Sequence, residues 1–580
     1  MLHIHRAERA DVLITALADV VSFPLDDPLA TEIVSVPTRG VERWLAQQLA
    51  TTLGASAGRS DGVCANVEFP FPSRLLGGAV AAATGVDPLY DPWLPERAVW
   101  PLVEMVDQSM AEPWMAPLAA HIGQASNGHR QSRRFESIRH LADLYDRYSL
   151  HRPAMLNAWA AGDDVDGNGE HLPAAVSWQA ELWRRLRGLI GVPSPAERLT
   201  GACSRLRADS GVVDLPTRMS LFGLTRLPAS HMEVLTALAE QRHVHLFLLH
   251  PSAALWAKVE TLTTGGAPIV RRRDDVTAAL PANPLLASWG HDAREMQLVV
   301  AGAGDRLGTD VRAVAEDATT LLHRIQADVR ADRAPSGAPF PGRTERHARL
   351  ESHDRSLQVH SCHGLARQVE VVRDAILHLL ADDPTLEARD VIVMCPDIET
   401  FAPLIHATFG AGAPVDDDDF TGAPTMPNLR VRLADRSLRQ TNPLLGVVAE
   451  ILELGSARVT AAQVLDLAGR EPVRRRFGFG DDDLSRVEDW VTATGVRWGL
   501  DAEHRAPFKL EWLATNTWSA GLDRVLLGVT MAEEGQPLVG RTLPLDDVGS
   551  ADIDLAGRLA ELLDRLKATL DDLRGPNTVP

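Results

Sequence analysis

The chain has 580 residues, 45% of them apolar, which suggests about three or four domains with large cores. Its formal net charge of −20 excludes a molecule that is basic all over, although a basic channel can still run inside an acidic body. No stretch approaches the roughly 18 apolar residues of a membrane helix and no signal-peptide pattern opens the chain, so we expect a cytoplasmic protein without membrane contact. The four cysteines form no Cys-x-x-Cys pair, so we expect reduced thiols and no metal site.

Two strand-then-helix units open the chain. Residues 1–5 form a short apolar strand pattern, and residues 11–17 follow with helical spacing. The pattern repeats with a strand at residues 32–37 and a helix at residues 41–49. A short apolar strand that runs straight into a helix is how a nucleotide-binding sheet begins, so the first fifty residues predict a sheet of that kind.

The first connection lacks the parts that bind ATP phosphates. A phosphate-binding loop needs a glycine-rich turn and a lysine, whereas residues 6–10 contain neither. Glu8 and Asp11 would face the place of the phosphate, and none of the three lysines in the chain follows a glycine-rich loop. Thr225 and Arg226 stand where a motor would place an Asp-Glu pair for magnesium. The sequence therefore predicts a nucleic-acid motor fold with a vacant ATP site.

Helical and α/β segments alternate along the first half. A third apolar run at residues 63–72 is typical of a strand that ends at prolines. Residues 74–210 are mainly helical, and a strand–helix–strand unit follows. The strands of that unit are expected at 218–224 and 244–250, around a helix at 229–240. We therefore expect a first helicase-like domain at 1–328, with an α/β core at 1–80 and 215–328 and a helical insertion at about 81–214.

The second half repeats this plan. Residues 329–355 are rich in Pro, Gly, Arg and Asp without apolar periodicity, which predicts a linker. A second α/β domain is expected at 356–441, and a helical block that would be its insertion at 442–580. The strands of this domain are expected at 356–360 and 390–395, each followed by a helix, at 368–380 and 398–409. The predicted fold class is α/β, with tandem superfamily-one helicase-like (RecA-like) domains, degenerate ATP motifs and a helical insertion in each.

Five stretches in order along the chain carry a resemblance to a known family. They are residues 1–13 with Trp44 and Leu45, then 65–72, 283–290, 359–371, and 495–499 together with 517–528. These stretches resemble the RecC family, the gamma subunit of exodeoxyribonuclease V (the RecBCD helicase–nuclease). Members of that family are considerably longer, so we expect this chain to be about the N-terminal half. The bias of arginine over lysine suggests a GC-rich genome, such as that of an actinobacterium.

The resemblance implies a structural role. A RecC subunit grips RecB and RecD, splits the ends of double-stranded DNA and guides single-stranded DNA through channels, one of which scans for the Chi recombination signal. ATP and Mg²⁺ would then belong to the partner subunits, and this chain would hold no cofactor, metal or catalytic residue. The alternative hypothesis of an autonomous helicase is disfavoured because the chain lacks the lysine of a phosphate-binding loop and the Asp-Glu pair. A scaffold without DNA contact stays open, and it would place the arginine clusters on the outer surface.

Residues implicated in Chi reading can be carried over from the family position by position. Four of them match: Asp143, Leu144, Asp146 and Arg152. At the second strand–turn–helix the family has glutamine, threonine and glutamine where this chain has Pro37, Arg39 and Arg43, and Phe71 replaces a leucine. Glutamine reads a base edge in two places, whereas arginine prefers guanine or phosphate. The resemblance therefore implies a strand channel at these residues, but not recognition of the usual Chi sequence.

Two arginine groups in the helical insertion are further candidates for contact with the DNA backbone. They are Arg130, Arg133 and Arg134, and Arg184 and Arg187 beside Trp183. Arginine binds phosphate in a bidentate way and stacks on bases, and single-strand grooves combine it with aromatic side chains. The alternative is an exposed charged face, or pairing with nearby acids.

Overall fold

The computed structural model divides the chain into two compact units, Met1–Ser361 and Cys362–Pro580. It describes residues 1–574 apart from 26, 28, 57, 123–128, 264–271, 304–306, 311–318, 340, 343–345, 348–350, 411–428, 430, 434–440, 532–537 and 541. Among these residues, no helix is long and apolar enough to cross a membrane.

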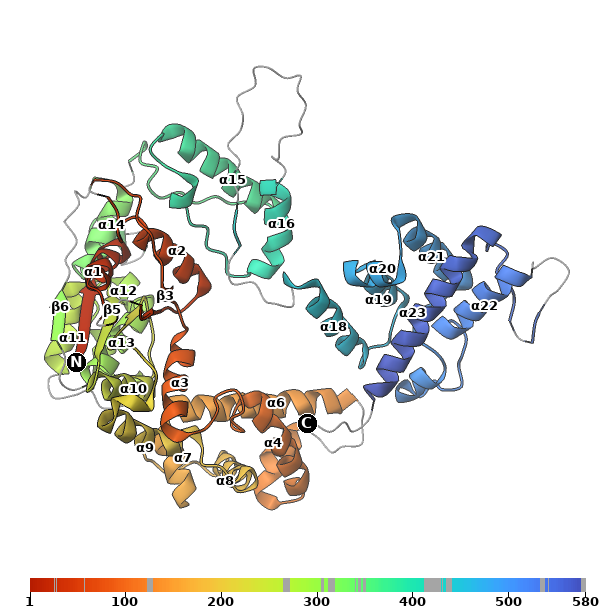
Figure 1. Cartoon of the computed structure of the whole chain (residues 1–580), viewed down its shortest axis with the longest axis horizontal. Helices are drawn as coiled ribbons and strands as arrows, with labels where there is room; N and C mark the ends of the chain where they lie inside the picture. The colour runs from red at the N-terminus through yellow and green to blue at the C-terminus, as the bar shows by residue number, and fades with distance from the viewer. Residues whose placement is uncertain are drawn as a thin grey trace. The chain divides into compact units, whose positions relative to one another are not determined.

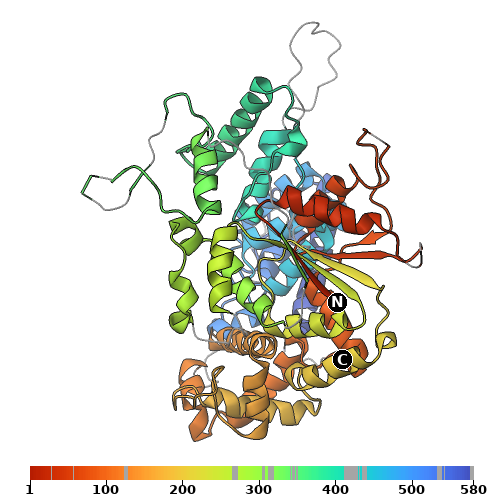
Figure 2. The same cartoon turned by 90° about the vertical axis from the view of Figure 1, so that its left-hand side faces the viewer.

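A six-stranded parallel sheet forms the centre of the first unit (Figures 1 and 2). Its strands lie in the order β3-β2-β4-β5-β1-β6. The strands are β1 (Leu2–Ala7), β2 (Glu32–Ser35), β3 (Val67–Glu68), β4 (Arg218–Phe222), β5 (His243–Leu249) and β6 (Leu307–Asp310). The first five confirm the strands predicted in this half, and β6 was not predicted. Buried Leu2 and Ile4 alternate in β1 with the half-buried His3 and His5, whereas β4 is buried on both faces from Met219 to Phe222, as is typical of a central strand in a parallel sheet.

Two layers of helices cover the sheet. One face packs on α3 (Pro72–Thr84), α9 (Pro195–Ala208), α10 (Ala229–Ala239) and α13 (His291–Ala301), and the core there is built around Leu221, Leu235 and Leu246. The other face packs on α1 (Ala10–Ser22) and α2 (Arg39–Leu49) through Leu13, Leu17 and Leu45. These layers fix the connections that leave the carboxyl ends of the strands, where the candidate site lies.

A helical block separates β3 from β4 in the sequence. Its members are α3, α4 (Pro95–Ser109), α5 (Ala116–Ile122), α6 (His129–His151), α7 (Pro153–Ala161), α8 (Trp178–Ile190) and α9. Helices α4 to α8 share a core of their own, in which Trp159 and Trp183 are fully buried. Trp183 is therefore a packing residue, and it does not present a surface for base stacking beside Arg184.

The last part of the first unit contains α11 (Ala253–Leu262), α12 (Pro284–Ser288), α13, α14 (Leu321–Arg330) and a small antiparallel pair, β7 (Ala338–Pro339) and β8 (Arg346–His347). Helices α11 and α12 bury Leu255, Val259 and Leu286 in a small cluster. The residues after Arg330, where the sequence predicts a linker, therefore include one short β-pair.

The second unit is helical where it is described. Its helices are α15 (Leu365–Asp382), α16 (Ile398–Gly410), α18 (Pro443–Leu454), α19 (Ala461–Gly469), α20 (Glu471–Phe477), α21 (Asp481–Thr494), α22 (Trp518–Thr530) and α23 (Ile553–Asp572). Helices α18 to α23 enclose one core that includes Trp490 and Trp518. Trp512 lies outside this core and is 74% exposed.

Both strands predicted for the second α/β domain are wrong for this structure. Residues 356–360 and 390–395 are described, and neither segment is paired as a strand. The side chains of Val359 and Met394 are 92% and 86% exposed. An apolar run becomes a strand only when neighbouring strands pair with its backbone and helices cover its side chains. Helices α15 and α16 pack on each other here, but nothing in the described part of the chain supplies that cover.

Candidate nucleic-acid interface

The candidate site lies at the edge of the first sheet where β1, β2, β3 and β4 end. In open parallel sheets ligands bind at the carboxyl ends of the strands, because the connections and helix N-termini gather there. Val36 donates a backbone hydrogen bond to the carbonyl of Pro70 over 3.2 Å, which joins the segments that follow β2 and β3. The residues predicted from these two segments are therefore neighbours.

The connection after β1 is too short to wrap a phosphate. Only Glu8 and Arg9 separate the last residue of β1 from the first residue of α1. Arg9 forms an ion pair with Asp11 at 2.7 Å, and this hydrogen bond lowers the pKa of the Asp11 carboxyl. Arg330 lies 3.8 Å from the Glu8 carboxylate. Carboxylates thus occupy the start of α1, where a nucleotide-binding protein would present backbone N–H groups to phosphate.

The connection after β2 has the opposite character. Thr38 caps α2 by accepting a hydrogen bond from the backbone of Val41 over 3.2 Å. Arg39 is the first residue of the helix, where the helix dipole disfavours a positive charge. Its side chain is 65% exposed, although Glu42 pairs with it at 3.0 Å. Arg43 follows one turn later, is exposed, and forms no ion pair with any residue that the structure describes. This helix end therefore presents two arginines toward solvent.

An aromatic ring adjoins this pair. The guanidinium of Arg39 lies over the ring of Phe71, 5.7 Å from its centre. Phe71 is the N-cap residue of α3, and its side chain is 36% exposed. The structure thus brings together two predicted residues from different segments. A cation stacked on an exposed ring is an arrangement on which an unpaired base can stack.

The other predicted group lies near the end of α6, which docks on the segment after β4. Ser230, in the first turn of α10, donates its hydroxyl to the carbonyl of Leu150 over 2.5 Å. Burial lowers the pKa of His151, and the positive charges of Arg152 and Arg226 lower it further. The backbone before Arg226 turns at Gly223, which has a φ of +72°. Arg152 is exposed, donates to the carbonyl of His151 over 3.0 Å, and extends its side chain alongside Gly167.

Acidic side chains precede this helix end. Asp143 and Leu144 are half-buried, and Asp146 is exposed. Desolvation by neighbouring groups raises the pKa of Asp146, and the negative charges of Asp143 and Glu96 raise it further. Carboxylates repel phosphate but accept hydrogen bonds from the amino groups of bases. Asp143 and Asp146 suit a contact with bases and do not suit a contact with the backbone.

The predicted backbone contacts in the helical insertion are paired with acids of the same unit. Arg134 pairs with Asp107 and is 20% exposed. Arg184 pairs with Asp164 at 2.7 Å and with Glu181 at 3.0 Å. The third pair joins Arg187 to Glu197 at 2.7 Å. The side chains of Arg130 and Arg133 lie outside the described residues. Phosphate would have to displace a carboxylate at each described arginine, and DNA contact there stays a prediction.

Two residues at this edge were not predicted as site residues. Arg226 is 59% exposed and pairs with Asp292 at 2.6 Å. Trp289 ends α12 three residues before Asp292 and is 77% exposed. The sequence places Arg226 after a strand, but only the position of α13 shows that an exposed tryptophan lies in the same neighbourhood.

Comparison with known proteins agrees with the resemblance seen in the sequence. Residues 2–332 match the family model described as RecC, N-terminal domain, and residues 441–580 match the model described as RecBCD enzyme subunit RecC fourth domain.

Three relatives named RecBCD enzyme subunit RecC are similar over nearly the whole chain. The protein of Mycolicibacterium smegmatis is 46% identical over 583 residues, which cover 99% of this chain and 50% of the relative. The protein of Mycobacterium tuberculosis (strain H37Rv) is 44% identical over 580 residues, with 99% and 50% covered. The Escherichia coli protein is 28% identical over 599 residues, with 98% and 51% covered. The chain spans about half the length of these relatives, and by the match to its N-terminal domain it belongs to the RecC family.

Proposed function

We propose that this chain is part of a non-catalytic subunit of a RecBCD-type helicase–nuclease that acts in double-strand-break repair and recombination. The subunit would split the ends of double-stranded DNA and guide the single strands, while RecB and RecD subunits supply ATP hydrolysis, Mg²⁺ and DNA cleavage. Action on the chromosome implies a cytoplasmic location. The observation that carries this proposal is the two-residue connection between β1 and α1, because its carboxylates stand where an active motor binds phosphate.

The proposed path of a single strand follows the edge of the first sheet. Arg39 and Arg43 would bind phosphate, and Phe71 would stack on a base. Asp143 and Asp146 would contact base edges, while Leu144 and Arg152 complete the path near β4. Scanning for a Chi-like signal would use this path. Since arginine replaces glutamine at Arg43, the preferred sequence is expected to differ from the usual Chi.

The first test is reconstitution of the full-length protein with its RecB and RecD partners. Unwinding of a blunt duplex is expected to fall to background when the RecC protein is omitted, because no other subunit would divide the duplex end. The RecC protein alone is expected to show no DNA-dependent ATP hydrolysis. DNA-dependent hydrolysis by this protein alone would instead establish an autonomous motor and overturn the proposal.

A scaffold without DNA contact is the second candidate. It is favoured by the pairing of Arg134, Arg184 and Arg187 with carboxylates and by the net charge of −20. Under that reading the complex would still require the protein for assembly. Binding to a duplex end would then be insensitive to the charge of Arg39 and Arg43.

We also propose that the first part of the second unit is a second helicase-like domain, whose strands pair when the rest of a full-length RecC protein is present. Residues 391–395 form a continuous apolar run, which is typical of a central parallel strand. Helices α15 and α16 follow the two apolar segments in the order of a strand–helix–strand–helix unit.

If this second domain forms, we expect the backbone amides of residues 391–395 to be protected from hydrogen exchange in the full-length protein. Their backbone amides are expected to exchange with deuterium at least about 100-fold more slowly than those of the exposed residues 351–353, because strand pairing would sequester them. Hydrogen–deuterium exchange followed by mass spectrometry measures both segments in one experiment. Equal exchange in the two segments would show that residues 391–395 stay unpaired.

A further inference from the structure

Four histidines form a continuous row across the two neighbouring strands β1 and β5. They are His3 and His5 of β1 and His243 and His245 of β5, which we call the histidine ladder. Alternate residues of a strand share a face, and the register places His3 opposite His245. The rings of His3 and His245 stack at 4.4 Å between centres with an angle of 8°. The ring of His5 stacks on Phe247 at 4.4 Å.

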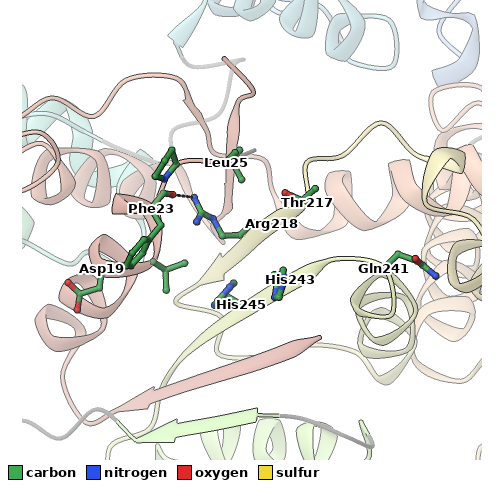
Figure 3. Close-up of a pocket in the computed structure, with 10 residues that line it drawn as sticks. Asp19, Phe23, Leu25, Thr217, Arg218, Gln241, His243 and His245 are labelled. Atoms are coloured by element: carbon green, nitrogen blue, oxygen red, sulfur yellow. Dashed lines mark hydrogen bonds between the residues drawn. The ribbon is translucent and has the colours of Figure 1, made fainter. Parts of the chain in front are cut away.

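The ladder divides one face of the sheet in two. Toward the carboxyl ends, the same face carries Ala7, Phe222 and Phe247, which are buried under α1 and α2. Toward the amino ends of β1 and β5 this face carries the four imidazoles, and His243 and His245 line a cavity of about 590 Å³. Figure 3 shows His243 and His245 on their strand below Arg218, with Phe23 across the cavity. Water in this cavity can therefore bring protons to the rings on this face of β1 and β5.

Each cross-strand pair shares one hydrogen. His3 Nε2 lies 3.1 Å from His243 Nδ1, and His5 Nε2 lies 3.0 Å from His245 Nδ1. A hydrogen bond between two ring nitrogens needs one donor and one acceptor, so at least one imidazole of each pair must be neutral. When both rings of a pair are protonated, two N–H groups face each other. Stacked parallel rings also point their nitrogen lone pairs along parallel directions, which does not favour convergence on one metal ion.

Besides burial, two positively charged groups, Arg218 and the amino group of Met1, lower the pKa values of ladder histidines. Arg218 of β4 borders the cavity, but Glu32 of β2 pairs with it at 2.6 Å and the carbonyl of Phe23 accepts from it at 2.8 Å. The amino group of Met1 donates to the carbonyl of Arg242 over 2.6 Å, and Glu240 acts on that amino group. Asp19 of α1 lines the cavity. No described carboxylate accepts a hydrogen bond from a ladder ring, so none compensates an added proton.

We propose that the histidine ladder is a proton-sensitive lock that holds β1 against β5 and opens when the medium becomes acidic. Uptake of protons places like charges on rings stacked at 4.4 Å and breaks both N–H···N bonds. The N-terminal strand with α1 would then separate from the sheet before the second unit is affected.

The lowered pKa values of the ladder histidines determine how the free energy of unfolding changes with pH. Burial lowers the pKa of His245 to about 3, and burial also lowers the pKa of His3 and His5, with repulsion from neighbouring histidines adding to it. In the unfolded chain these groups bind protons near the ordinary value of about 6.5. The free energy of unfolding is therefore undiminished above about pH 6.5 and decreases as the pH falls from there toward 3.

Hydrogen–deuterium exchange of the full chain at pH 7.0 and 5.5, corrected for the intrinsic exchange rate, tests the lock. Protection of β1 and β5 relative to α23 is expected to fall about tenfold or more in the native chain. In His245→Phe, which extends the ring column of Phe247, the fall is expected to be smaller than in the native chain, because His245 no longer takes up a proton while His3 and His5 still do. His245→Gln keeps a polar partner for His5 and serves where phenylalanine disturbs packing.

His140→Gln is the matched control, because His140 is exposed on α6 and lies outside the ladder. This control is expected to behave as the native chain does. An equal loss of protection in the native chain and in both His245 variants would overturn the lock, as would constant protection of β1 in the native chain.

Discussion

Replacing Arg505 with methionine is expected to destabilise the second unit by about 3–5 kcal/mol, the range for breaking a buried charged network. The Arg505 side chain is 1% exposed and donates to four backbone carbonyls. These belong to Leu513, Thr515, Trp498 and Asn516, at 2.8, 2.9, 2.6 and 3.3 Å. Its guanidinium also lies 4.4 Å from the centre of the Trp498 ring. One side chain therefore fixes the loop between α21 and α22. Methionine would remove the donor from the carbonyls of Leu513, Thr515 and Trp498, whereas the carbonyl of Asn516 would keep its bond from the backbone of Arg497.

The matched control is Arg475→Met. Arg475 is 83% exposed and pairs only with Glu471 of its own helix among the described residues, so its loss is expected to cost at most about 0.5 kcal/mol. Arg505→Lys should lie close to Arg505→Met, because a single ammonium cannot reach four separated carbonyls. Denaturation in urea followed by tryptophan fluorescence measures each variant, and hydrogen exchange of α22 assigns the transition to the second unit. Similar losses in Arg505→Met and Arg475→Met would contradict this account.

The strands of the first sheet were predictable because their signals are local. In β5, Val244, Leu246 and Leu248 alternate with His243, His245 and Phe247, and the helix at 229–239 precedes the strand with its own period. The short connection between β1 and α1 was also visible, since it depends on which residues follow β1. Such features need only the order of residues along the chain.

The remaining features depend on partners that are distant in the sequence. Residues 391–395 have the composition of a strand, but pairing decides whether one forms, and no partner lies in the described part of the chain. Arg184 and Arg187 look available for DNA until the fold brings Asp164 and Glu197 to them. The contact of Arg39 with Phe71 crosses from α2 to the start of α3. The residue types of this site could be predicted from the sequence, but their grouping required the sheet.

Reversing the charge of Arg39 and Arg43 together is expected to weaken binding of the reconstituted complex to a blunt duplex end by about tenfold or more. Both side chains point into solvent from the first turns of α2, and two phosphate contacts would be lost. Glutamate at the first position of a helix is favoured by the helix dipole, so Arg39→Glu should leave the fold intact even though it removes the pair with Glu42. A loss of affinity would then report on DNA contact and would not reflect unfolding.

The control is Arg475→Glu with Arg476→Glu, which makes the same change of charge at two exposed residues of the second unit. Fluorescence anisotropy at several salt concentrations gives the dissociation constant of each complex. The slope of its logarithm against the logarithm of salt concentration should decrease by about 2 for the Arg39 and Arg43 variant, since each phosphate contact contributes close to one counterion. An unchanged slope, or equal weakening by the control, would favour the scaffold without DNA contact, because a complex that merely assembles on this protein has no reason to distinguish the two arginine pairs.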